Sequence, residues 1–308
     1  MSELPITAPD PRVVDRFTNR DTLRKERWRF GHDVFMTLCI GAISRSEKRY
    51  FTVSDLMLST EIMSAEATAV SKVTHIGHNP IWMAMYAGDP THASQVSGQV
   101  MHALSGYQST PFALVAHTYQ AAFKQILEKK INDEVLNVYG MTREQFIKEG
   151  RNAFGDEEFG RIIYKISHTK LDTEFLIGNP TTLFSISDPG VIEYHDSLGF
   201  HAIGTGCILA QAWLYGLFDQ KAPSREILYH LLEAKFRGER ASGVGRKTFV
   251  TFTDETGTVR EGFRPEDCEK IRAIWETDGQ PKIPQAYFDF IGHQPELSLW
   301  PFKDDPTQ

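Results

Sequence analysis

Thr37 could be either a catalytic nucleophile or an ordinary strand residue. It follows Met36 and opens the apolar run TLCIGAIS. A threonine hydroxyl is a weak nucleophile unless a base takes its proton as it attacks a carbonyl. If Thr37 were the first residue of a mature chain, its own α-amine, with an ordinary pKa of about 7.7–8.0, could serve as that base. Otherwise Thr37 is one more β-branched strand residue.

Two hairpins are predicted around this threonine. Residues 37–44 lead through the polar turn RSEKR into YFTVSD, which ends at Asp55. Residues 69–76 lead through GHNP into IWMAMYAGD, which is apolar on both faces and therefore indicates a sheet covered on each side. Asp89 and Pro90 then supply an N-cap and a first-turn proline for a helix that runs to about Gly106.

The rest of the chain alternates between helical and extended patterns. Residues 112–170 read as helical almost throughout, with a capping box at Thr142 and Gln145. Strands are predicted at 173–179, 181–187, 191–197 and 199–206, helices at 208–218 and 224–237, and a closing hairpin at 247–262. Ser224 is the expected cap of the second helix. This order predicts an α+β protein, a four-layer αββα sandwich of two stacked antiparallel sheets with helices outside.

Charge and cysteine content exclude several classes of protein. The net charge of −7 offers no basic field for nucleic acid or an anionic membrane, so neither partner is expected. Three scattered cysteines suggest a reducing compartment, with the cytoplasm as the default location. The N-terminal residues lack the basic and apolar regions of a signal peptide, and the apolar segment 206–218 is too short to span a bilayer.

Several short segments of the sequence resemble the proteasome β-subunit family of N-terminal-nucleophile (Ntn) hydrolases, which includes HslV and bacterial proteasome-like proteins. The resemblance covers roughly residues 36–255, and the segments that carry it most specifically are MTLCIGAIS, VSD, SKV, YAGD and HAIGTGCILAQAW. It implies the same αββα fold. The helical stretch 107–170 is longer than the usual helix pair of that family, and residues 265–308 have no counterpart in it.

The resemblance implies a set of catalytic residues. The nucleophile falls on Thr37, the strand-end aspartate on Asp55, the lysine on Lys72, and the backbone N–H that binds the oxyanion on Gly88. A cationic Lys72 would lower the pKa of a neighbouring amine, and Asp55 would orient and neutralise that lysine. Such an oxyanion donor is typically worth about 3–4 kcal/mol.

A supporting shell follows from the same resemblance. The corner serine of the family becomes Thr205, and its Asp-x-x-Ser-Gly element falls on residues 239–243, with Glu239 in place of aspartate and Ser242 and Gly243 retained. These residues would hold the amine and a proton-shuttling water. The extra methylene of Glu239 changes the geometry of this shell.

A free amine on Thr37 requires the loss of residues 1–36. We therefore expect an N-terminal extension or propeptide over residues 1–36, with one surface helix at 11–34, and an Ntn-hydrolase domain with a C-terminal extension over residues 37–308. Autocatalytic processing is the route in proteasome subunits, where glycine usually precedes the threonine. Here Met36 precedes it, so translation could instead begin at Met36, and methionine aminopeptidase would then expose Thr37.

The expected function is hydrolysis of amide bonds in peptides by a threonine protease without cofactor or metal. The resemblance implies a homo-oligomer, a ring or stacked assembly, with any ATPase partner unidentified. Two alternatives stay open. One is a catalytically inactive assembly or scaffold subunit that retains residues 1–36, and the other is an Ntn amidase that acts on a small molecule.

Other chemistry-bearing residues have simpler explanations. His75 and His78 flank a turn without an evident third ligand, so a surface turn is favoured over a metal site. The segment 238–248 has the glycines of a phosphate-binding loop but not its spacing. Cys39 and Cys207 lie in apolar segments and are expected in the core.

Overall fold

The computed structural model describes residues 37–59, 64–66, 72–253 and 257–279. The helix predicted over residues 11–34, the remainder of the N-terminal extension and the tail from residue 280 onward lie outside the described residues.

The first antiparallel sheet carries Thr37 at one end. Its strand order is β10-β1-β2-β11-β12. The strands are β1 (Cys39–Ser44), β2 (Arg49–Asp55), β10 (Phe200–Ile203), β11 (Thr248–Thr253) and β12 (Val259–Glu261). The predicted hairpin of β1 and β2 pairs Cys39 with Ser54, so Thr37 and Asp55 both lie at its open end.

The second antiparallel sheet has the order β5-β6-β7-β8-β9. Its strands are β5 (Val73–Ile76), β6 (Trp82–Gly88), β7 (Thr173–Gly178), β8 (Leu183–Ser187) and β9 (Val191–Tyr194). The predicted second hairpin is β5–β6, which pairs Val73 with Met85. Its apolar strand β6 is buried along most of its length, as the pattern of the segment indicates.

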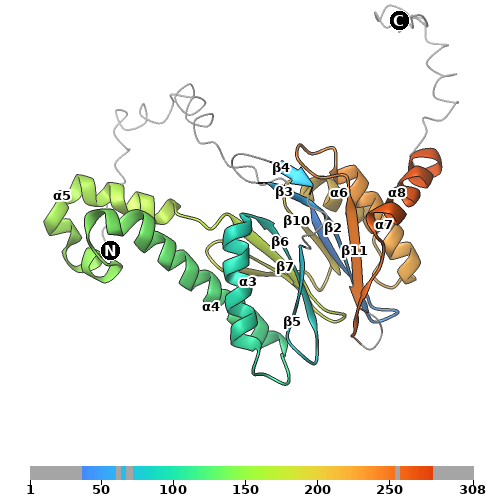
Figure 1. The fold of residues 1–308 in the computed structure, drawn as a ribbon, viewed down its shortest axis with the longest axis horizontal. Helices are drawn as coiled ribbons and strands as arrows, with labels where there is room; N and C mark the ends of the chain where they lie inside the picture. Colours follow the sequence, from blue (N-terminus) through green and yellow to red (C-terminus); the bar gives the residue numbers. More distant parts are fainter. Residues whose placement is uncertain (1–36, 60–63, 67–71, 254–256, 280–308) are drawn as a thin grey trace, which may run out of the picture.

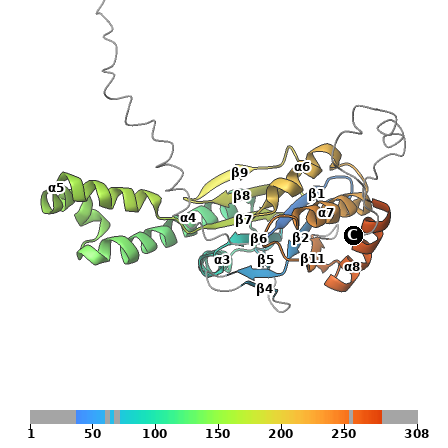
Figure 2. The ribbon, with the colours of Figure 1, turned by 90° about the horizontal axis from the view of Figure 1, so that it is seen from above.

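Helices cover the outer face of each sheet, as Figures 1 and 2 show. The helices α3 (Pro90–Leu104) and α4 (Phe112–Ile131) share an apolar core with the second sheet. The helices α6 (Cys207–Leu217), α7 (Ser224–Gly238) and α8 (Pro265–Ile274) share another core with the first sheet. A third core, with Cys39, Met85 and Leu176, joins the two sheets. The predicted four-layer αββα architecture is confirmed.

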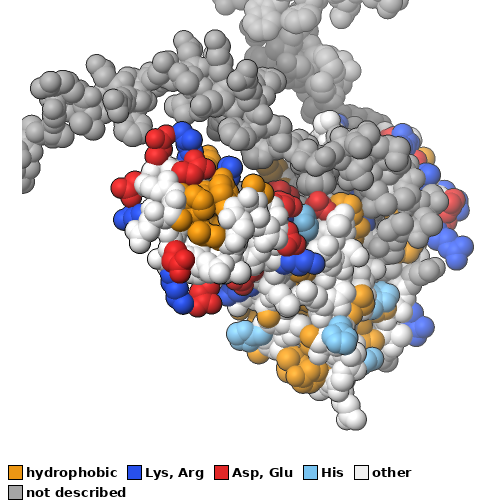
Figure 3. Space-filling model, turned by 60° about the vertical axis from the view of Figure 1, so that its left-hand side comes forward, with side chains coloured by type: hydrophobic (Ala, Val, Ile, Leu, Met, Phe, Trp, Pro, Cys, Tyr) orange, Lys and Arg blue, Asp and Glu red, His pale blue; other side chains and the backbone are white. Residues whose placement is uncertain are grey.

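The long helical region projects from the sandwich as an arm (Figures 1 and 2). Beyond α4, a π-helical turn (Asn132–Leu136) and a 3-10 turn (Asn137–Tyr139) lead to α5 (Arg143–His168), which bends at Gly155. The predicted capping box of Thr142 and Gln145 is present. The arm has a small core of its own, which contains Phe146 and Ile162. Figure 3 brings the arm forward and shows an apolar patch ringed by charged side chains.

Local details of the sequence prediction need correction at three places. The cap of α7 is Pro223, and Ser224 is the first helical residue, whose hydroxyl lies 3.4 Å from that of Ser44. Helix α8 was not predicted, nor was the short ribbon of β3 (Met57–Ser59) and β4 (Ser64–Glu66). The predicted N-cap of α3 is present, since the Asp89 side chain accepts hydrogen bonds from the N–H groups of Thr91 and His92.

None of the helices in the described part of the chain combines the length and the apolar character that a membrane span requires.

The core between the sheets should dominate the stability of the sandwich. Leu176 is fully buried there, so Leu176→Ala should lower the free energy of unfolding by about 2–5 kcal/mol. Ile147 on the arm is 69% exposed, and Ile147→Ala should change that free energy by less than about 0.5 kcal/mol. Urea unfolding of the three proteins measures both effects. Equal stability of Leu176→Ala and the parent protein would contradict this placement of the core.

Candidate functional site

Three side chains predicted to act together meet between the sheets. The Thr37 hydroxyl donates a hydrogen bond to Oδ1 of Asp55 at 2.7 Å. The ammonium group of Lys72 donates to the same Asp55 oxygen and to the Thr37 hydroxyl oxygen. Relative exposure is 4% for Thr37, 0% for Asp55 and 2% for Lys72.

Strand pairing brings these residues together. Asp55 ends β2, and its backbone N–H donates to the carbonyl of Leu38 at 3.1 Å, next to Thr37. Lys72 immediately precedes β5 in the second sheet. The site therefore spans both sheets and depends on how they face each other.

The Asp55 carboxylate is fully compensated despite its burial. Its second oxygen, Oδ2, accepts a hydrogen bond from the backbone N–H of Gly245 at 2.9 Å. A buried carboxylate is stable only when a cation and hydrogen-bond donors replace water. Thr37, Lys72 and Gly245 supply these, so Asp55 can hold the threonine hydroxyl and the lysine in a fixed relation.

The corner between β10 and α6 packs against the backbone of Thr37. Gly204 has a φ of +90°, and a side chain there would approach Cγ2 of Thr37 to 2.8 Å and collide with its carbonyl oxygen. The N–H of Gly206 lies 3.4 Å from that same oxygen. Thr205 stands between these two glycines, so this corner lies beside Thr37.

Gly88 ends β6 in a backbone conformation that needs glycine. Its φ is +101°, and a side chain would collide with the carbonyl oxygen of Asp172. The preceding residue, Ala87, packs with Cys39 in the core between the sheets. Gly88 therefore lies at the end of β6 that faces the beginning of β1.

The predicted shell residues 239–243 lie on the loop between α7 and β11. Glu239 binds Arg272 through two hydrogen bonds of 2.7 and 2.8 Å and also binds the Lys235 ammonium. Ser242 is exposed, and Gly243 has a φ of +82° within the turn. The contact of this loop with Asp55 is made by the backbone of Gly245.

Sequence reasoning missed Gly245, Lys235 and Arg272. A signal for Lys235 was present, because it stands four residues after Leu231 and eight after Ile227 on the buried stripe of α7. The lysine is 0% exposed. Arg272 belongs to a helix that the resemblance did not cover.

Cys39 does not compete with Thr37 as a nucleophile. Burial raises the pKa of its thiol to about 12, against the opposing effect of Lys72. The thiol also lies 3.4 Å from the carbonyl oxygen of Tyr86, to which it donates. Cys39 is therefore a protonated core residue, as the sequence predicts.

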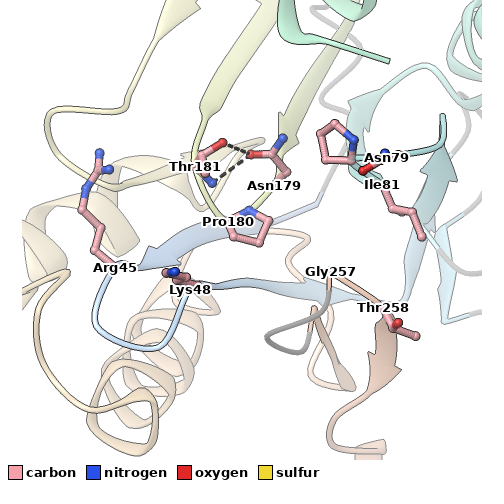
Figure 4. A pocket seen from close by; sticks show the side chains of 10 residues that line it. Arg45, Lys48, Asn79, Ile81, Asn179, Pro180, Thr181, Gly257 and Thr258 are labelled. Carbon is pink, nitrogen blue, oxygen red and sulfur yellow. Dashed lines mark hydrogen bonds between the residues drawn. The ribbon is translucent and has the colours of Figure 1, made fainter. Parts of the chain in front are cut away.

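A separate hollow lies at the other end of the β1–β2 hairpin (Figure 4). It has a volume of about 720 Å³, and its lining includes Arg45, Lys48, Asn179, Pro180 and Thr181. None of the predicted catalytic residues borders it. Within the residues that the structure describes, no group of three or more histidine, cysteine, aspartate and glutamate side chains could hold a metal ion.

The arrangement of two face-to-face antiparallel sheets with helices outside is shared with solved structures. Among solved structures, Anbu from Yersinia bercovieri, an ancestral beta-subunit, is similar with a TM-score of 0.56 and 12% identity over 85% of this chain and 100% of that one. The Gly-1 mutant of Anbu from Hyphomicrobium sp. strain MC1 gives a TM-score of 0.54 and 14% identity over 84% and 97%. No family profile and no curated protein matches the sequence. The likeness therefore concerns the fold.

Removal of the Lys72 charge should destabilise the protein strongly. Lys72→Met leaves the buried Asp55 carboxylate without its cation and should cost about 3–5 kcal/mol in the free energy of unfolding. The double variant Lys72→Met, Asp55→Asn should recover part of that loss. Lys148 is an exposed lysine paired with Glu144, so Lys148→Met is the matched control, with a loss below about 1 kcal/mol. Equal effects of Lys72→Met and Lys148→Met in urea unfolding would refute the buried pair.

Glu174 should make stability depend on pH. Burial, with a smaller effect of Glu193, raises the pKa of its carboxyl from 4.5 to about 7. The unfolded chain loses this proton first, so the stability of the parent protein should fall relative to Glu174→Gln as the pH rises from 4.5 to about 7. Urea unfolding of both proteins at about pH 4.5 and about pH 8 measures the difference. The same difference at both pH values would contradict the assignment.

Proposed function

We propose that this chain is a threonine-type Ntn hydrolase that cleaves amide bonds through an acyl-enzyme on Thr37. The observation that carries the proposal is the buried contact of the Thr37 hydroxyl with Asp55 and Lys72. Two charged side chains, Asp55 at the end of β2 and Lys72 before β5, converge on this one hydroxyl, although a threonine beside a strand needs no such partners for folding.

The reaction requires prior cleavage of the peptide bond between Met36 and Thr37. The free α-amine of Thr37 then takes the hydroxyl proton while Oγ1 forms a bond to the substrate carbonyl carbon. Lys72 keeps the pKa of that amine low and stabilises negative charge on Oγ1, while Asp55 holds Lys72 in place. The backbone N–H of Gly88 binds the oxyanion of the tetrahedral intermediate.

Breakdown of that intermediate completes the first half of the reaction. The carbon–nitrogen bond of the substrate breaks, and the protonated α-amine gives its proton to the leaving amine. A water molecule then attacks the ester on Thr37 with the amine as base, and the acid product leaves. Thr205, Glu239, Ser242 and Gly243 belong to the surrounding shell: Thr205 beside the Thr37 backbone, the other three on the loop that binds Asp55.

We further propose that the active form is a homo-oligomer that acts on a peptide or a small amide. The likeness to the ancestral beta-subunit Anbu supports a subunit of an assembly. The alternative is an inactive assembly subunit that keeps residues 1–36, in which the nitrogen of Thr37 stays in a peptide bond and the amine base does not exist.

Substitution of Thr37 tests the proposal directly. With processed protein and a panel of peptides and small amides, Thr37→Ala should lower the rate by at least roughly 10³-fold, because the attacking oxygen is lost. Thr37→Ser keeps that oxygen and should retain measurable hydrolysis and labelling by an epoxyketone. Thr91 on the exposed start of α3 offers the control Thr91→Ala, which should be as active as the parent protein.

Two results would decide against this function. Full activity of Thr37→Ala would exclude Thr37 as the nucleophile. The absence of epoxyketone labelling in protein from the native host would instead favour the inactive assembly subunit. Which members of the substrate panel are cleaved separates a peptidase from a small-amide hydrolase.

A further inference from the structure

Helix α8 packs behind the loop that contacts Asp55. Its residue Cys268, together with Trp275 directly after the helix, joins the core of the first sheet with α6 and α7 (Figure 1). This anchored helix carries Arg272, which is only 4% exposed and faces the loop between α7 and β11. Burial of a guanidinium group is stable only when its donors are matched.

Arg272 binds the loop at both of its ends. Its guanidinium donates to the two carboxylate oxygens of Glu239 at 2.7 and 2.8 Å. It also donates to the carbonyl of Arg246 at 3.0 Å, one residue after Gly245. The Cζ atom of Arg272 also lies over the ring of Phe236, 4.1 Å from the ring centroid. A planar fork donates in parallel to both oxygens of one carboxylate and still reaches the Arg246 carbonyl, a geometry that an ammonium group does not reproduce.

Lys235 links Glu239 to Gly245, the residue before Arg246. Its ammonium donates to Glu239 and, at 2.8 Å, to the carbonyl of Gly245. Burial lowers the pKa of this lysine, while the charges of Glu239 and Asp55 oppose that effect. The N–H of Gly245 then donates to Oδ2 of Asp55 at 2.9 Å. A continuous set of hydrogen bonds therefore runs from α8 to the carboxylate that holds Thr37.

We propose that Arg272 is a positioning residue: by clamping Glu239 and the Arg246 carbonyl, it fixes the Gly245 N–H against Asp55. Its effect on catalysis rests on the proposed function, but its effect on the loop does not. Glu239 acts in this network as the link between Arg272 and Lys235. Because Lys235 still neutralises Glu239 when Arg272 is absent, loss of Arg272 disturbs the loop without leaving a lone buried carboxylate.

Hydrogen–deuterium exchange of the full chain tests the clamp without any need for activity. In Arg272→Met, amides of residues 239–247 should exchange about tenfold faster or more, while those of β1, β2 and β7 stay protected. Arg272→Lys keeps the charge but not the fork, so it should show the same loop change. Lys270 is exposed on the same helix and pairs with Asp267, so Lys270→Ala is the control and should match the parent protein.

Protection of the loop in Arg272→Met equal to that of the parent protein would overturn the proposal, and full restoration by Arg272→Lys would overturn the requirement for a fork. If Arg272→Met loses protection in the sheets as well, the test passes to Arg272→Lys. Faster exchange of residues 239–247 with protected sheets would then support the clamp, and loop protection equal to that of the parent protein would overturn it.

Kinetics then separate this proposal from the proposed function. With processed protein, Arg272→Met should lower kcat by about tenfold or more with KM unchanged, because a displaced Asp55 affects the attack and not substrate binding. An unchanged kcat in a protein whose loop exchange rises would overturn the catalytic part of the proposal. Faster loop exchange in a protein that no Thr37-directed electrophile labels would support the clamp and refute the hydrolase function.

Discussion

The buried carboxylate of Asp55 holds three distant parts of the chain together. At 0% exposure it must exchange water for internal donors, and these come from three separate parts of the chain: Thr37 at the start of β1, Lys72 beside the second sheet, and Gly245 on the loop after α7. The two sheets and the α7–β11 loop can therefore adopt only relative positions that keep these contacts. The same requirement places two charged groups, Asp55 and Lys72, at a threonine hydroxyl that would otherwise need neither.

The layers of the fold keep Thr37, Asp55 and Lys72 in contact. The core between the sheets fixes the distance between Lys72 and the first sheet, and the helices outside keep each sheet from shifting. Glycines at positions 88 and 204 permit close backbone approach where a side chain would collide, one with Asp172 and the other with Thr37. Helix α8 also contributes to this arrangement, because its Arg272 binds the loop that reaches Asp55.

The sequence predicted most of the fold because long elements have strong patterns. The apolar β6, the Asp89 cap of α3 and the capping box of α5 were all found. Thr37, Asp55 and Lys72 could be selected only through a resemblance, because each alone is an ordinary residue at the end of a hairpin. Lys235 was missed because lysine is usually solvated, although its spacing on the buried stripe of α7 was a usable signal. The three-residue strands β3 and β4 are too short to give any pattern.

Hydrolysis through Thr37 requires that this residue be the N-terminus of the working protein, since only then does its α-amine exist as a base. Intact mass and N-terminal sequencing of the protein isolated from its native host test this most directly. We expect a chain that begins at Thr37, whether by removal of residues 1–36 or by translation from Met36. A chain that begins at Met1 or Ser2 would contradict it, because the nitrogen of Thr37 would then remain within a peptide bond.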